Sequence, residues 1–164
     1  MGASAGGLEA LSAFLKALPA RTGMAVVVIQ HLAPQHESAL TQLLSKATSM
    51  PVLEVSHGMP VERNHVYVIP PDKIMTIRDG ALLLIPRERA SVPHHPIDEF
   101  YAALAPERKT AAIGVILSGS GSDGTLGLKA IKTEGGVTFA QDPKTAAWSA
   151  MPTSACLLYT SRCV

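Results

Sequence analysis

Met1-Gly2-Ala3-Ser4-Ala5-Gly6-Gly7 is the stretch around which this chain is organised, because a serine stands there between glycines, directly before an amphipathic run. The spacing Gly2-x-Ser4-x-Gly6 is that of a nucleophile elbow, a sharp strand-to-helix turn that leaves a serine hydroxyl exposed. Small residues are needed beside such a turn, since a Cβ would collide with the reversing backbone. Two interpretations stay open: a catalytic serine, or a glycine turn that holds a phosphate or only reverses the chain.

Outward from this stretch, hydrophobic periodicity predicts alternating helices and strands. Helices are expected over residues 8–18, 37–47, 97–104 and 125–133, and strands over 24–29, 52–55, 66–69, 111–117 and 137–140. Continuous apolar runs such as Met24–Ile29 are typical of strands buried on both faces of a parallel sheet. The pattern therefore predicts an α/β fold, a doubly wound, mostly parallel sheet with helices on both faces.

The segments between these elements are expected to be turns and loops, with one exception. Asp79-Gly80 separates two β-like runs, 74–77 and 81–85, and so predicts one antiparallel hairpin attached to the parallel sheet. His57–Pro60 is interpreted as a turn, and Arg87–Pro96 as a polar loop.

Composition and charge limit the classes of protein that fit. The chain has 164 residues, 47% of them hydrophobic, and a net charge of +1 without a Lys/Arg cluster, which favours one globular domain and argues against a nucleic-acid partner. No apolar run approaches the roughly 20 residues of a membrane span, and no signal peptide is recognised, so we expect a cytoplasmic protein without membrane insertion. Cys156 and Cys163 are too few for a disulfide framework, and no Cys/His spacing resembles a zinc site.

Three polar residues fall at corresponding places in this pattern. Ser4 precedes the first helix, His31 follows the strand 24–29, and Asp123 lies in the glycine-rich loop after the strand 111–117. The carboxyl ends of parallel strands open on one edge of a sheet, so a Ser–His–Asp hydrogen-bonded chain is expected there. Each residue also has an ordinary interpretation: a helix cap, a half-buried histidine and a turn aspartate. The order Ser, His, Asp differs from that of α/β-hydrolases.

The remaining histidines are assigned to loops and to the surface: His36, His57, His65, His94 and His95. Adjacent residues of an extended segment point in opposite directions, so the pair His94-His95 makes a poor chelate.

The motifs around these candidates resemble those of one known family, the CheB-type catalytic domain of chemotaxis protein-glutamate methylesterases. The segments that carry the resemblance are Gly2-Ala3-Ser4-Ala5-Gly6-Gly7, Gln30-His31-Leu32-Ala33-Pro34 and Gly119-Ser120-Gly121-Ser122-Asp123-Gly124. Three motifs in the family's order, spread over about residues 1–157, make the resemblance specific. The sequence looks closest to members of the family that are fused to a methyltransferase. The expected domain is 1–157, with 158–164 as an atypical tail.

The resemblance implies a serine hydrolase of a Rossmann-like, three-layer fold that removes methyl esters from glutamate side chains on the cytoplasmic helices of chemoreceptors. Protein-glutamine deamidation would be its second activity, in a phosphorelay-controlled signalling pathway with fused or separate receiver and methyltransferase domains. Ser4 would be the nucleophile, His31 the base and Asp123 its orienting acid, with the backbone N–H groups of Ser120 and Ala5 receiving the oxyanion.

The same resemblance implies substrate contacts at Gly119, Gly121 and Gln30, and calls for neither a metal nor a cofactor. The family has a core strand before Gly2 and a final strand and helix, so we expect a chain cut at both ends. Two alternatives are kept: an inactive, partner-binding fragment, and an anion-binding α/β module that uses the loop Gly2–Gly7.

Overall fold

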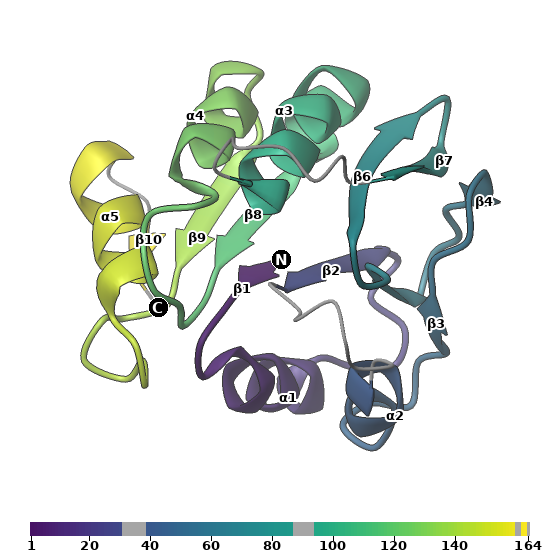
Figure 1. The fold of residues 1–164 in the computed structure, drawn as a ribbon, viewed down its shortest axis with the longest axis horizontal. Coiled ribbons are helices and arrows are strands. Elements are labelled where there is room, and N and C mark those ends of the chain that lie inside the picture. Colours follow the sequence, from purple (N-terminus) through teal and green to yellow (C-terminus); the bar gives the residue numbers. More distant parts are fainter. Residues whose placement is uncertain (31–38, 87–93, 160–161, 164) are drawn as a thin grey trace.

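A computed structural model describes residues 1–30, 39–86, 94–159 and 162–163 (Figure 1). Its main feature is a seven-stranded sheet in which every neighbouring pair is parallel. In spatial order the strands are β10 (Arg162–Cys163), β9 (Val137–Ala140), β8 (Ile113–Ile116), β1 (Gly2–Ala3), β2 (Val26–Gln30), β5 (Val66–Val68) and β3 (Val52–Glu54). The predicted parallel α/β architecture is confirmed.

Helices cover both faces of this sheet, as the pattern predicted. Figure 1 shows α1 (Gly7–Ala17) and α2 (Ala39–Ser45) on one face, and α3 (Pro96–Arg108), α4 (Thr125–Thr133) and α5 (Ala150–Tyr159) on the other. A short 3₁₀ helix, Lys109–Ala111, joins α3 to β8. Within the described part of the chain, no helix is long and apolar enough to cross a membrane.

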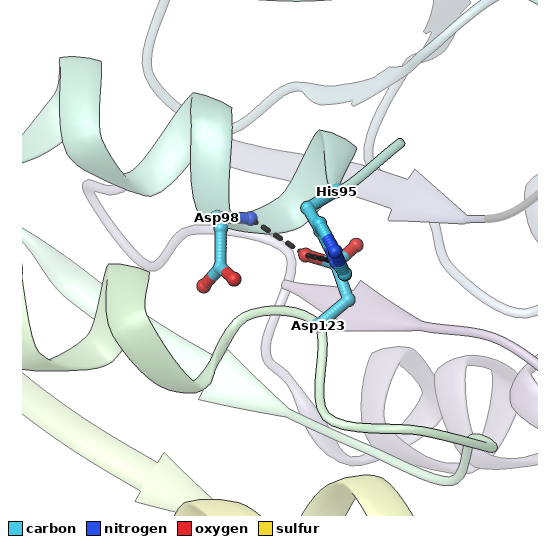
Figure 2. Close-up of side chains that lie close together, drawn as sticks. All are labelled: His95, Asp98 and Asp123. Carbon is cyan, nitrogen blue, oxygen red and sulfur yellow. Dashed lines mark hydrogen bonds and ion pairs between the residues drawn. The ribbon is translucent and has the colours of Figure 1, made fainter. Parts of the chain in front are cut away.

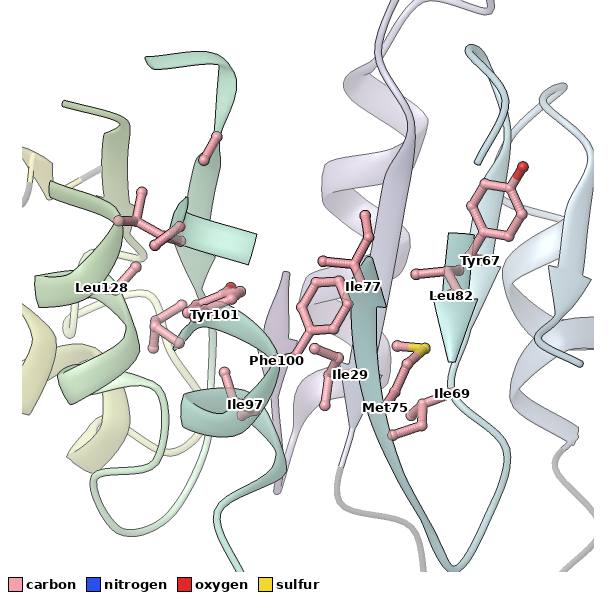
Figure 3. Packing of buried hydrophobic residues seen from close by; sticks show 14 of the residues in the cluster. Ile29, Tyr67, Ile69, Met75, Ile77, Leu82, Ile97, Phe100, Tyr101 and Leu128 are labelled. Carbon is pink, nitrogen blue, oxygen red and sulfur yellow. The ribbon is translucent and has the colours of Figure 1, made fainter. Parts of the chain in front are cut away.

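Two hydrophobic cores result, because alternate side chains of a strand point to opposite faces. Val26 and Val28 of β2 pack in the cluster that also holds Leu11 of α1 and Leu44 of α2. Ile29 packs in the other cluster (Figure 3), with these neighbours from β5, α3, α4 and a second sheet: Tyr67, Met75, Ile77, Leu82, Ile97, Phe100, Tyr101 and Leu128. The chain therefore has the layered core of a doubly wound fold.

The predicted hairpin forms, but it is not attached to the parallel sheet by strand pairing. Its strands β6 (Lys73–Arg78) and β7 (Ala81–Pro86) pair with β4 (Met59–Pro60) in a separate antiparallel sheet of three strands. Asp79 and Gly80 have φ of 50° and 73°, the left-handed pair that a two-residue hairpin turn requires. The interpretation of 57–60 as a turn was thus wrong for Met59–Pro60, where long-range pairing with β7 decides the conformation.

Besides β4 and the 3₁₀ helix, three elements were not expected from the sequence: β1, α5 and β10. Strand β1 has only two residues, yet it lies at the centre of the sheet, paired with β2 through Gly2 and Ala3 and with β8 through Gly2. Helix α5 lacks a strong apolar periodicity, and Pro152 stands in its first turn, where a proline is tolerated. Local patterns were too weak to predict these elements.

Candidate active site

Ser4 lies in a strand–turn–helix connection, as the elbow motif predicted. It follows β1 directly, and the turn closes with a hydrogen bond from the Gly7 N–H to the Ser4 carbonyl, 2.9 Å. Gly6, the N-cap of α1, has φ +68°. A Cβ there would stand 2.8 Å from the Ala147 Cβ, so both the backbone angle and the space require glycine.

The order of the strands brings the three candidate positions to one edge of the sheet. Strand β1 lies between β8 and β2, so Ser4 comes from the central strand of the three. The loop that carries Asp123 leaves β8 on one side, and on the other side β2 ends at Gln30. His31 is the next residue in the sequence and lies outside the described residues. The carboxyl ends of adjacent parallel strands form the usual ligand crevice of such folds.

Asp123 is 3% exposed, and the amino-terminal end of α3 holds both oxygens of its carboxylate; Figure 2 shows the contact that Asp98 makes. The Ile97 N–H donates to Oδ2 at 3.1 Å, and the Asp98 N–H donates to Oδ1 at 3.0 Å. Backbone N–H donors and the positive end of a helix dipole both favour an ionised carboxylate. Asp123 is thus an oriented, buried acid, suited to fix the ring of a base.

Asp98 completes a reciprocal arrangement between two helices. Its own Oδ1 accepts a hydrogen bond from the Gly127 N–H in the first turn of α4, 2.7 Å. Asp123, just before α4, therefore caps α3, while Asp98, just inside α3, caps α4. Burial raises the pKa of Asp98, and the negative charge of Asp123 raises it further, although the Gly127 N–H acts in the opposite direction. The two carboxylates hold the starts of α3 and α4 together.

His95 lies beside this carboxylate, which the assignment of His95 to a surface loop did not foresee. Its Nδ1 is 3.8 Å from the Asp123 Oδ1, and its side chain is 50% exposed. His94 is directed instead to Glu99, with its Nδ1 3.7 Å from Oε1, so the two adjacent rings do have different partners. Sequence spacing could not place His95 here, because 28 residues separate it from Asp123.

In the part of the chain that the structure describes, one group of side chains could reach a common metal ion. The ligand atoms of His95, Asp98 and Asp123 lie within 4.8 Å of one another (Figure 2). Both carboxylates already accept backbone N–H bonds at helix starts. We therefore interpret the cluster as a capping network and assign no metal to it.

Ser118, the second residue after β8, makes hydrogen bonds to the serine turn and to the segments that carry Gln141 and Trp148. Its carbonyl accepts the Ser4 N–H at 3.0 Å, and its Oγ donates to the Ala5 carbonyl at 2.8 Å. The same Oγ accepts the Trp148 N–H at 3.0 Å, and the Ser118 N–H donates to the Gln141 Oε1 at 2.9 Å. Ser118 is 1% exposed, so a single buried serine joins three segments. The sequence analysis did not single it out.

The residues expected to receive the oxyanion or contact the substrate lie close to Ser118 in the sequence or in the serine turn that it binds. Among the described residues, no hydrogen-bond acceptor is found for the N–H of Ala5 or Ser120. Gly121 is exposed, with φ +80°, whereas Gly119 is buried and donates its N–H to the Trp148 carbonyl at 3.0 Å.

Gln30 presents its side chain to the serine turn. A Cβ built on Gly7 would lie 3.6 Å from the Gln30 Cδ and Nε2. The Gln30 Oε1 is buried and has no hydrogen-bond partner among the described residues. Because this oxygen is closed to solvent, the structure places Gln30 against the serine turn, and its contact with a substrate stays a prediction.

The sequence also matches known proteins over most of its length. A family model described as CheB methylesterase matches residues 1–162. A putative protein-glutamate methylesterase/protein-glutamine glutaminase of Leptospira interrogans is 33% identical over 156 residues, 94% of this chain and 81% of that protein. Protein-glutamate methylesterase/protein-glutamine glutaminase 3 of Burkholderia orbicola is 36% identical over 156 residues, 94% of this chain and 46% of that protein.

An uncharacterised 104.1 kDa protein of Rhodobacter capsulatus is 42% identical over 116 residues, 71% of this chain but 12% of that protein. The chain thus spans less than half the length of this relative and of the Burkholderia relative. Among solved structures, the catalytic domain of the Thermotoga maritima CheB methylesterase matches with a TM-score of 0.83 and 29% identity, over 94% of this chain and 84% of that domain.

Proposed function

Because the chain belongs to the CheB methylesterase family, we propose that it is a serine hydrolase that removes methyl esters from glutamate side chains of chemoreceptors or similar signalling proteins. The observation that carries the proposal is the strand order β8-β1-β2: Ser4 follows the central strand, the Asp123 loop follows one neighbour, and His31 comes next in the sequence after the other. The activity is assigned to residues 1–157, in the cytoplasm, where receptor signalling helices would be its substrate.

The proposed reaction has two steps. His31 takes the Ser4 hydroxyl proton while Asp123 orients the imidazole, and Oγ attacks the ester carbonyl. The N–H groups of Ser120 and Ala5 receive the oxyanion, and the ester C–O bond breaks as His31 returns the proton to the departing methanol. Water then attacks the acyl-enzyme with His31 as base, which releases the glutamate carboxylate and restores Ser4.

The fixed carboxylate of Asp123 supports its role in these steps. Each of its oxygens accepts one α3 backbone N–H, and a carboxylate oxygen has a second lone pair that can accept an imidazole N–H. The names of the relatives also include protein-glutamine glutaminase. The same steps with an amide substrate release ammonia in place of methanol, so we propose glutamine deamidation as the second activity.

Four variants test the nucleophile and the base. Ser4→Ala should abolish methanol release from a methylated receptor fragment and labelling by a fluorophosphonate, without loss of the folded state. Ser122→Ala is the matched control, since Ser122 is an exposed serine of the Asp123 loop. His31→Ala should lower activity by a factor of about 10³ or more. If His95→Ala lowered activity this strongly while His31→Ala did not, the choice of base would be wrong. Full activity of Ser4→Ala would overturn the proposed function.

A further inference from the structure

Trp148, the one tryptophan of the chain, is 56% exposed at the rim of the candidate site. An indole is among the largest apolar surfaces a side chain can offer, and in folded proteins it is usually well buried. The neighbours Ala147, Ser149 and Ala150 are also exposed, and no charged residue stands between Lys144 and Met151. This exposed segment therefore consists of small, uncharged side chains on either side of one large aromatic ring.

The segment with Trp148 is fixed to the residues that position Ser4. The Trp148 N–H donates to the Ser118 Oγ at 3.0 Å, and its carbonyl accepts the Gly119 N–H at 3.0 Å. The Met151 N–H donates back to the Gly119 carbonyl at 3.0 Å. Backbone groups on both sides of the indole are thus held by the loop that follows β8, so the backbone that carries the ring has a defined position.

The ring itself lies against the serine turn. A Cβ built on Gly6 would come within 3.3 Å of the Trp148 Cδ1. Gly119, to which Trp148 is bonded, packs on the nucleophile, since a Cβ there would stand 3.0 Å from the Ser4 Cβ. An isolated exposed hydrophobic residue needs no explanation, but this one lies against Gly6, which is two residues from the candidate nucleophile in the sequence.

We propose that Trp148 is a substrate-contacting, specificity-determining residue whose exposed indole packs on an apolar side chain of the substrate protein next to the esterified glutamate. The inference rests on the proposed function, because it takes the ester to be carried by a protein. A protein that brings a side-chain ester to Ser4 also lies over the rim of the turn. The segment 145–150 carries no charged side chain, which favours an apolar contact with Trp148 over an acidic one.

Replacing Trp148 should weaken binding of the protein substrate and leave the chemistry at Ser4 unchanged. Aromatic anchors at interfaces commonly contribute most of the binding free energy, so Trp148→Ala should raise KM for a methylated receptor fragment by about tenfold or more. Its kcat should stay within about twofold of wild type, as should Ser4 labelling by a small fluorophosphonate, which does not reach the rim. Trp148→Phe should restore much of the affinity. Ile85→Ala is the matched control, since Ile85 is 50% exposed on β7 of the separate sheet.

Fluorescence supplies a readout that does not depend on turnover. In the Ser4→Ala variant the indole of Trp148 is the one tryptophan emitter, and a tryptophan-free methylated fragment should shift its emission to shorter wavelength as it binds. An unchanged spectrum together with an unchanged KM in Trp148→Ala overturns the inference. If the emission of Trp148 shifts with enzyme concentration and without the fragment, the surface binds a second copy of this chain, and the inference is also overturned. A fragment-dependent shift without Ser4 labelling of the wild-type chain would leave the contact standing and refute the proposed function.

Discussion

Replacing Ser118 by alanine should cost both stability and nucleophile alignment, because its hydroxyl bonds to both the serine turn and the Trp148 segment. Besides a long contact of Oγ with the Trp148 carbonyl at 3.5 Å, two short hydrogen bonds disappear: the one from Oγ to the Ala5 carbonyl, 2.8 Å, and the one from the Trp148 N–H to Oγ, 3.0 Å. Each is worth about 1 kcal/mol net, and partly buried groups left without partners add to the loss. We expect Ser118→Ala to lower the free energy of unfolding by about 2 kcal/mol.

Urea unfolding measures this loss. With a slope of about 2 kcal/mol per molar urea, the midpoint should fall by about 1 M. The rate at which a fluorophosphonate labels Ser4 should fall as well, by about tenfold or more under conditions where the variant is folded, since the Ala5 carbonyl is released beside the nucleophile. Ser122→Ala, an exposed serine four residues further on, should change both quantities little.

The result that would refute this reasoning is specific. If Ser118→Ala lost less than about 0.5 kcal/mol and labelled at the wild-type rate, its two side-chain bonds would carry no weight in the turn. If stability fell but labelling of the folded variant did not, Ser118 would act on the fold alone and not as a positioning residue for Ser4.

Two further predictions concern the turn and the helix starts. Gly6→Ala should destabilise the chain by about 2–4 kcal/mol, since φ is +68° and the new Cβ would lie 2.9 Å from the Ser118 Oγ; urea unfolding within 1 kcal/mol of wild type would contradict it. Asp98→Asn should flatten the pH dependence of stability: because the folded pKa of Asp98 is raised, its carboxyl favours folding below its unfolded pKa, and that contribution is lost as the pH rises through the folded pKa. The variant should therefore gain stability relative to wild type as the pH rises above the usual pKa of an aspartate, measured by urea unfolding, and a parallel pair of curves would contradict the prediction.

The fold class could be predicted from the sequence because its signals are local. The β-branched run of β2, the amphipathic run of α1 and the Asp79-Gly80 turn each form under the influence of near neighbours, and each was found where expected. Elements that depend on distant partners were missed. The two residues of β1 are a strand because β2 and β8 pair with them on either side. Met59–Pro60 pairs with β7, more than 20 residues away.

The family could be recognised from three short motifs, and the comparisons confirm that recognition. Motif order also indicated Ser4 and Asp123 as residues of one sheet edge, since parallel strands present their carboxyl ends together. The roles of Ser4, His31 and Asp123 stay predictions until the variants above are measured.

By itself, the sequence determined the alternation of strands and helices, the glycine turn around Ser4 and the family. Only the tertiary structure decided what holds the edge in place. The α3 N–H groups on Asp123 come from 25 and 26 residues away, and the Ser118 hydroxyl reaches the Ala5 carbonyl across 113. His95 and Trp148 came to the site in the same way, as a loop histidine and an exposed aromatic without any motif. Contacts of this kind leave no periodic trace in the sequence, because they depend on how separate elements pack and not on the spacing of residues within one of them.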